Sequence, residues 1–130
     1  MSERVLAVDP GEVRIGLAVS DPLRVIARPL KVIRHSSRKQ DAEAILAEAA
    51  ALEAGTIVVG VALDMEGKIG PQARRALRLV EALRSLTDLP IVTWDESGST
   101  LAAGKRDARL DARAAAVILQ EYLDGQDKQR

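Results

Sequence analysis

Two apolar runs near the start of the chain are separated by a carboxylate and a turn. Val5–Val8 is a continuous apolar segment that ends at Asp9, and Ile15–Val19 is a second one. The Pro10-Gly11 pair between them is typical of a tight turn. The pattern therefore predicts a buried strand, a turn and a neighbouring strand, with Asp9 at the carboxyl end of the first strand.

A third segment, Leu23–Ile33, alternates only loosely between apolar and polar positions. It contains Pro29, which lacks the backbone N–H that a central strand would use in its ladder. We therefore expect an edge strand here, and an antiparallel meander for the first three strands.

Helical periodicity alternates with two further apolar runs in the rest of the chain. Apolar residues recur at helical spacing over Lys39–Ala54, from Pro71 onward and over Ala108–Leu123. The runs between these helices, Thr56–Val61 and Leu89–Trp94, predict the fourth and fifth strands. The arginines of the second helix are expected to form its solvent face.

This order of elements predicts an α/β fold with one mixed five-stranded sheet flanked by helices. The last two strands each follow a helix, and such crossovers are right-handed and place the new strand parallel to the first. The 130 residues suit a single domain, 1–130, with a flexible tail from about residue 124. Ligands of such sheets gather at the carboxyl ends of the strands.

Carboxylates stand at three places near that edge. They are Asp9 after the first strand, the Asp95-Glu96 pair after the fifth, and Asp111 near the start of the last helix. An ionised carboxylate is rarely buried unless it is paired or binds a metal. Each residue also has a structural interpretation, because Asp9 can start a turn, Glu96 can be a solvated loop charge and Asp111 can favour a helix N-terminus.

Basic residues are concentrated in one segment, although the formal net charge is zero. Six lysines and arginines and no acid lie between residues 24 and 39: Arg24, Arg28, Lys31, Arg34, Arg38 and Lys39. The segment fits either a surface that holds a polyanion or a solvated edge strand blunted by positive charge.

Composition excludes several classes of protein. The chain has no cysteine, which excludes a disulfide framework and a thiolate metal site. It has no run of apolar residues long enough to span a membrane, and no charged-then-apolar leader opens it. We therefore expect a cytoplasmic protein without a membrane partner.

Four motifs lie in register along the chain: VDPGEVRIGLAVSDP, VVGVALDMEGKIGPQA, IVTWDES and LDARAAAVILQEYLD. Together they resemble the YqgF/RuvX family of Holliday-junction-resolvase-like nucleases, and the resemblance covers nearly the whole chain. It implies the ribonuclease H-like fold with strand order 3-2-1-4-5. It also implies a metal-dependent endonuclease that acts on branched DNA or on the 5′ end of the precursor of 16S rRNA.

Carried over residue by residue, the resemblance implies that Asp9, Glu96 and Asp111 are catalytic and bind metal. Two Mg²⁺ or Mn²⁺ ions would be expected, with Asp9 shared between them, because two divalent ions can stabilise both the attacking and the leaving oxygen of a phosphodiester. Asp95 and Asp64 are weaker candidates as outer ligands. Arg14, Ser99, Thr100 and the six basic residues of segment 24–39 are the expected nucleic-acid contacts.

The sequence also departs from the family pattern. Ser97 stands where the family has a basic residue, and the segment from Thr100 to Asp111 is short, so the choice between DNA and RNA stays open. A homodimer is expected if the substrate is a four-way junction, because symmetric cutting needs two sites related by a two-fold axis. The alternative function is a non-catalytic nucleic-acid-binding module of the same fold that associates with ribosomes.

Overall fold

A computed structural model describes residues 3–96 and 108–128, with the side chains of residues 3–96 and 112–126. The strands and helices follow one another in the predicted order. The strands are β1 (Arg4–Asp9), β2 (Arg14–Ser20), β3 (Ala27–Arg34), β4 (Ala54–Val61) and β5 (Ile91–Asp95). The helices are α1 (Arg38–Ala51), α2 (Pro71–Leu86) and α3 (Ala108–Lys128).

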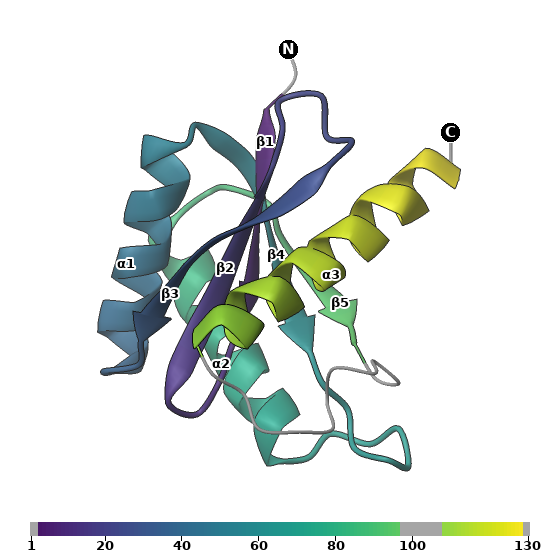
Figure 1. The fold of residues 1–130 in the computed structure, drawn as a ribbon. Coiled ribbons are helices and arrows are strands. Elements are labelled where there is room, and N and C mark those ends of the chain that lie inside the picture. The colour runs from purple at the N-terminus through teal and green to yellow at the C-terminus, as the bar shows by residue number, and fades with distance from the viewer. Residues whose placement is uncertain (1–2, 97–107, 129–130) are drawn as a thin grey trace.

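The strands form one mixed sheet in the order β3-β2-β1-β4-β5 (Figure 1). β1 pairs antiparallel with β2 and parallel with β4, and β4 pairs parallel with β5. The three parallel strands therefore end at the same edge of the sheet, which Asp9, Val61 and Asp95 mark. The predicted α/β class and the strand order 3-2-1-4-5 are confirmed.

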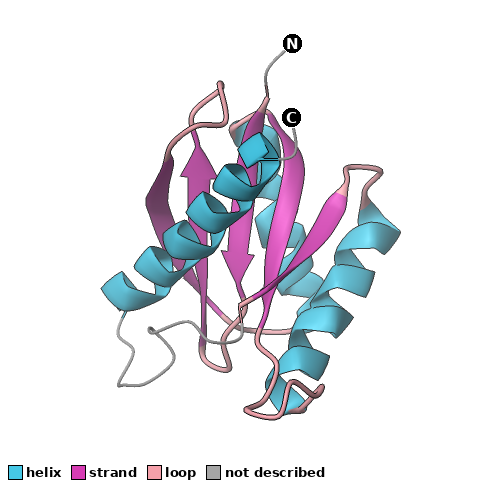
Figure 2. Ribbon diagram, turned by 90° about the vertical axis from the view of Figure 1, so that its right-hand side faces the viewer, coloured by secondary structure: helices cyan, strands magenta, loops and turns pink. Residues whose placement is uncertain are grey.

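Helices cover both faces of the sheet: α1 and α2 lie on one face, and α3 crosses the other (Figure 2). Successive side chains of a strand point to opposite faces. In β1, Leu6 and Val8 pack beneath α1 and α2, whereas Val5 and Ala7 pack beneath α3, and all four are fully buried. The next residue in this alternation, Asp9, therefore belongs to the α3 face.

Contacts at the two edge strands of the sheet, β3 and β5, hold α3 in place. The Gln120 Oε1 accepts the Ala27 N–H at 2.9 Å, and the Gln120 Nε2 donates to the Val25 carbonyl at 3.0 Å. Further along the helix, the Tyr122 ring meets the Trp94 ring edge to face, with their centroids 5.9 Å apart. α3 is thus tied to the edge strand β3 on one side and to β5 on the other.

The third strand begins at Ala27, four residues later than the sequence pattern indicates, because Asp21 organises the preceding loop. The Asp21 Oδ1 accepts the N–H groups of Val25 at 2.7 Å and of Ile26 at 2.9 Å. Backbone donors that are used in this turn are not available to a strand ladder.

Two helix ends also differ from the periodicity. α1 ends at Ala51, and Glu53 adopts a left-handed φ of 55°, so that β4 already begins at Ala54. α3 continues to Lys128, and the segment that was expected to be a tail from about residue 124 is helical up to that point. At Gly125 the backbone of α3 comes close to Trp94, since a Cβ there would lie 3.3 Å from the Trp94 ring.

Candidate active site

Asp9 is the last residue of β1 and is only 3% exposed. Its neighbour across the antiparallel ladder is Gly16 of β2. Placing a carboxylate in this position costs free energy unless its charge is compensated. A buried acid at the carboxyl end of the central strand is therefore the first feature that packing alone does not explain.

Glu96 follows β5 and extends the parallel ladder by one bond, because its N–H donates to the Val61 carbonyl at 3.0 Å. Its carboxylate lies over Gly60 of β4. A Cβ at Gly60 would stand 3.3 Å from both the carboxyl carbon and the Oε2 of Glu96, and 2.7 Å from the Ile118 Cδ1 of α3. The missing side chain at this position makes the room that the Glu96 carboxylate occupies.

The strand register brings Asp9 next to the same glycine. Val8 of β1 pairs with Val59 of β4, so one residue further along Asp9 lies beside Gly60. Adjacent strands are about 4.8 Å apart. Asp9 and Glu96 therefore gather on the α3 face at the carboxyl edge of the sheet, with Gly60 between them.

The third predicted acid, Asp111, belongs to the first turns of α3, the helix that covers this face. Its side chain lies outside the described residues, and so do Ser99 and Thr100. Among the side chains that are described, no group of three or more histidines, aspartates or glutamates is arranged to hold a metal ion. The convergence of three carboxylates therefore stays a prediction. Of the three, Asp9 and Glu96 lie on the same face beside Gly60.

The two weaker candidates lie differently. Asp95 is exposed, and strand alternation puts it on the face opposite to Glu96. Asp64 organises the loop after β4, because its Oδ1 accepts the N–H groups of Glu66 at 2.9 Å and of Lys68 at 2.8 Å. Neither residue shares the position of Asp9 beside Gly60.

The predicted nucleic-acid contacts that the structure describes lie at several places on the sheet and on α1. Arg24 lies at the opposite end of the sheet from Asp9, where it donates to the Glu3 carbonyl and to the Thr56 hydroxyl, with a left-handed φ of 60°. Its contacts give it a structural role in the loop before β3. Lys31 on the edge strand forms an ion pair with Glu48 of α1 at 2.8 Å.

Of the remaining basic residues, Arg14 and Arg34 lie nearest to the carboxyl edge, whereas Arg28 lies at the end of the sheet where β1 begins. Arg14 and Arg34 are cross-strand neighbours at the ends of β2 and β3, and with Val13 and Val32 they line a shallow cavity of about 330 Å³. Arg28 is exposed on β3, and Arg38 and Lys39 are exposed in the first turn of α1. Whether these residues contact nucleic acid stays a prediction.

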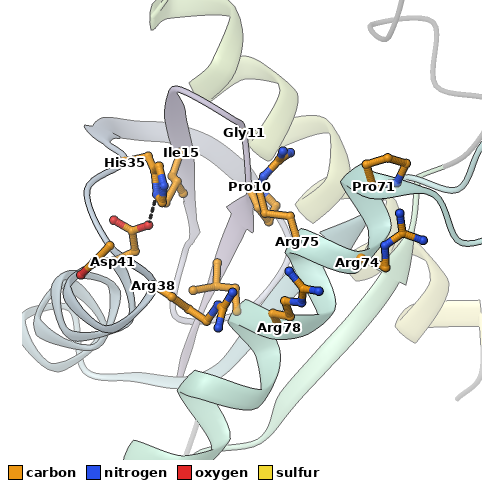
Figure 3. Close-up of a pocket in the computed structure, with 12 residues that line it drawn as sticks. Pro10, Gly11, Ile15, His35, Arg38, Asp41, Pro71, Arg74, Arg75 and Arg78 are labelled. Carbon is orange, nitrogen blue, oxygen red and sulfur yellow. Dashed lines mark hydrogen bonds and ion pairs between the residues drawn. The ribbon is translucent and has the colours of Figure 1, made fainter.

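A cluster of arginines on the face of the sheet that α1 and α2 cover was not predicted from the sequence. Arg74, Arg75 and Arg78 of α2, which were expected to form a solvent face, line a pocket together with Arg38 of α1 (Figure 3). The exposed His35 contacts the buried Asp41 in the same pocket. The signal in the sequence was the dense run of arginines directly after Gly70-Pro71, which periodicity alone could not assign to a pocket.

Within the described helices, no segment is both long and apolar enough to cross a membrane.

Comparison with known proteins identifies the family and the fold of the chain. The family model RuvX, Holliday junction resolvase, matches residues 3–125. A protein of Roseiflexus sp. (strain RS-1) named "Putative pre-16S rRNA nuclease" is 42% identical over 95% of this chain and 95% of its own length. A protein of the same name from Anaeromyxobacter sp. (strain Fw109-5) is 43% identical over 94% of this chain and 97% of its own.

Among solved structures, the chain is similar to the RuvC protein of T. thermophilus in complex with a Holliday junction substrate. The TM-score is 0.63 at 15% sequence identity, over 97% of this chain and 96% of that one. At this identity the similarity concerns the fold, and it confirms the predicted ribonuclease H-like fold.

Proposed function

Because the chain belongs to the RuvX family, described as Holliday junction resolvases, we propose that it is a metal-dependent endonuclease for structured nucleic acid. The name shared by its relatives favours the precursor of 16S rRNA as the substrate. The fold that it shares with RuvC makes a four-way DNA junction the second substrate to be tested.

One observation carries the proposal. A buried carboxylate, Asp9, ends the central strand, and a second, Glu96, occupies the space that Gly60 leaves open beside it. Two acids brought to one point from strands that are far apart in sequence repel each other, and cations relieve that repulsion.

The donor set fits a hard divalent cation. Carboxylate oxygens are the ligands that Mg²⁺ and Mn²⁺ prefer, and the chain has no cysteine that would favour a softer metal. Asp9, Glu96 and Asp111 would hold the ions. When bound, divalent cations supply a water that is activated for attack and charge stabilisation for the phosphodiester oxygens.

Helical spacing supports the third ligand. Asp111 precedes Ile118 by seven residues, so the two positions lie on the same face of α3. Ile118 is buried against the α3 face of the sheet, close to Gly60. The position of Asp111 is therefore on the side of the helix that faces the sheet.

The surrounding residues keep the site in shape. The apolar core beneath α3, which includes Val58, Ile118 and Leu119, closes the inner side of the site to water. The contact between Trp94 and Tyr122 fixes the end of β5, and with it the backbone that carries Glu96. Fixed ligands lose less entropy on binding a cation, so this packing favours the bound state.

The test is a cleavage panel with two substrates, the precursor of 16S rRNA and a four-way DNA junction, each with Mg²⁺ and with Mn²⁺. Wild type should cleave one of them, and Asp9→Asn should not, because the amide removes a charged ligand without changing the shape of the side chain. Asp88→Asn, an exposed aspartate in the loop before β5, is the matched control and should cleave like wild type.

The panel also separates the alternatives. Binding of either nucleic acid without cleavage under all metal conditions would overturn the nuclease proposal in favour of a non-catalytic module. If the junction is the substrate, sedimentation should show a dimer, since symmetric cutting needs two sites. Cleavage of the rRNA precursor places no such requirement on the oligomeric state.

A further inference from the structure

A second concave site lies across the sheet from Asp9, between α1, α2 and the β1–β2 turn (Figure 3). It has a volume of about 530 Å³, which is in the range of ligand pockets. Its walls combine cationic and apolar side chains, namely Arg38, Arg74, Arg75 and Arg78 with Pro10, Ile15, Pro71 and Leu79.

The acid in this pocket is engaged by neighbours in its own segment. Of the described residues that line it, Asp41 is the one carboxylate, and it is buried. Its Oδ2 contacts the His35 Nδ1, and its Oδ1 accepts the Ser36 N–H at 3.0 Å. Both oxygens are used by the segment that leads into α1, and Asp41 forms no ion pair with the arginines of the pocket in the described part of the chain.

The arginines have little other compensation. In the described part of the chain, no ion pair involves Arg38, Arg74 or Arg78. Arg75 is 3.8 Å from Glu12, whose side chain is 82% exposed, and a pair of this kind contributes little. Four like charges around one cavity repel each other, and a bound anion would relieve that repulsion.

The backbone adds to the positive potential. Ser37 caps the N-terminus of α1 and lines the pocket, and Pro71 lines it from the first turn of α2. No side chain caps α2, and its first turn holds no acid. Helix N-termini carry a partial positive charge and bind phosphate groups readily, and residues at the N-termini of both helices line this pocket, with Asp41 in the first turn of α1.

We propose that this pocket binds the phosphate of a nucleotide, with the arginines on the phosphate and the apolar wall against the nucleoside. Planar guanidinium groups bind phosphate through paired hydrogen bonds. The cavity is larger than an inorganic anion needs, and Pro10 and Pro71 offer apolar surface for a sugar or a base above the buried Ile15 and Leu79. The nucleotide is either free or part of a nucleic-acid strand.

The proposal does not depend on the nuclease activity, because the pocket and the acidic site lie on opposite faces. Asp9 and Pro10 are consecutive, but Asp9 belongs to the α3 face and Pro10 lines the pocket. Binding can therefore be measured with EDTA present, when no divalent cation is available for cleavage.

The experiment is calorimetric titration of the whole chain in EDTA with adenosine, inorganic phosphate and adenosine 5′-monophosphate. The monophosphate should bind most tightly. In Arg74→Gln/Arg78→Gln its affinity should fall by about tenfold or more, since charge-assisted hydrogen bonds are lost. Lys68→Gln/Arg113→Gln removes the same amount of charge from exposed positions that do not line the pocket, and it should bind like wild type.

Two results would overturn the proposal: equal affinity of the pocket variant and wild type, or adenosine binding as tightly as its monophosphate. Inorganic phosphate binding as tightly as the monophosphate would refute the role of the apolar wall. A short oligonucleotide with a 5′-phosphate identifies the source, because affinity above that of the free nucleotide, lost in the pocket variant, indicates a strand, whereas affinity below it indicates a free nucleotide.

The control for the proposed function is Asp9→Asn, which should keep wild-type affinity for the monophosphate. Loss of cleavage with retained nucleotide binding supports both proposals. Cleavage that depends on Asp9 together with no nucleotide binding would refute the pocket and leave the nuclease intact.

Discussion

The two faces of the sheet carry opposite charge on either side of one turn. On the α3 face, Asp9 and Glu96 gather beside Gly60. On the face of α1 and α2, arginines from both helices surround a cavity that begins at Pro10. A net charge of zero conceals this separation completely. Charge that is averaged over a chain therefore says little about what one edge of a sheet can bind.

The faces also differ in how their charges are supported. Asp9 ends the buried strand β1 and Glu96 directly follows the edge strand β5, so their positions are set by ladder hydrogen bonds such as that of Glu96 to Val61. The arginines extend from helix surfaces, and Arg74 and Arg78 are exposed. A rigid acidic site suits catalysis, which requires fixed geometry, whereas long cationic side chains suit binding, which tolerates adjustment.

Among substitutions that test the two faces separately, Asp9→Asn should have the largest effect, which is on cleavage. The rate should fall by about a thousandfold or more, because the substitution removes the proposed shared metal ligand. The free energy of unfolding should change by no more than about 1 kcal/mol, since the substitution keeps the volume and removes a buried charge. Single-turnover kinetics and urea unfolding measure the two quantities. If Asp9→Asn is unfolded at room temperature, the loss of cleavage is due to the loss of the fold and not to the loss of the carboxylate.

Gly11→Ala should disturb both faces at once. A Cβ at this position would lie 2.2 Å from the Arg14 carbonyl oxygen, so the backbone of the β1–β2 turn must move. We expect a loss of about 1–3 kcal/mol in unfolding free energy, together with weaker cleavage and weaker nucleotide binding. Gly70→Ala is the control, because its nearest non-local atom would be 3.9 Å away. Wild-type stability, cleavage and nucleotide binding in Gly11→Ala would show that the turn does not link the two sites.

Gly60→Ala should affect the acidic face alone. Its Cβ would press on the Glu96 carboxylate at 3.3 Å and on the flexible end of Ile118 at 2.7 Å. Displacing a ligand in this way should weaken Mn²⁺ binding by about tenfold, at a cost in stability of about 1 kcal/mol. Calorimetric Mn²⁺ titration tests it, with nucleotide affinity as the internal reference. Unchanged Mn²⁺ affinity would mean that Glu96 does not bind the ion from this position.

The smallest effect is expected for Asp21, which lies in the loop before β3, away from both sites. A substitution there is a reference for the variants on both faces. Hydrogen bonds from the Ile26 and Val25 N–H groups lower the pKa of Asp21 below its usual 3.8. A lowered pKa in the folded state means that the charged form stabilises the fold above pH 3.8 and that this contribution is lost as the pH falls through the lower, folded value.

Asp21→Asn should therefore lower the melting temperature slightly at neutral pH, and the difference from wild type should disappear in acid. Thermal unfolding over a pH series measures it. Cleavage and nucleotide binding should not change, because Asp21 is remote from both sites. A difference that persisted unchanged into acid would show that the charge of Asp21 is not its cause.

Local pattern was enough to predict most of the fold. The apolar runs that end at Asp9 and Trp94 became β1 and β5, and Pro29 marked the edge strand β3. These predictions hold because a strand or helix buried on one side must repeat its apolar residues at a fixed period. Element ends were less certain, since the start of β3 depends on a hydrogen-bonded loop around Asp21.

The candidate acids could also be chosen from sequence, because a carboxylate directly after a buried strand lies at an edge where ligands bind. The selection of Glu96 over Asp95 rested on the family resemblance. The structure adds a physical reason, since alternation along β5 turns Glu96 toward Gly60 and Asp95 toward the other face.

The arginine pocket depended on tertiary structure alone. Arg38 and Arg74 are separated by a helix, a strand and a loop, and nothing in the period of either helix tells which surface will face its neighbour. Periodicity records whether a residue is in contact with the core, but a concave surface arises only when two elements pack at a given angle. The amino-acid sequence by itself thus determined the sheet and its acidic edge, and only the packing of α1 against α2 decided that exposed arginines would surround a cavity.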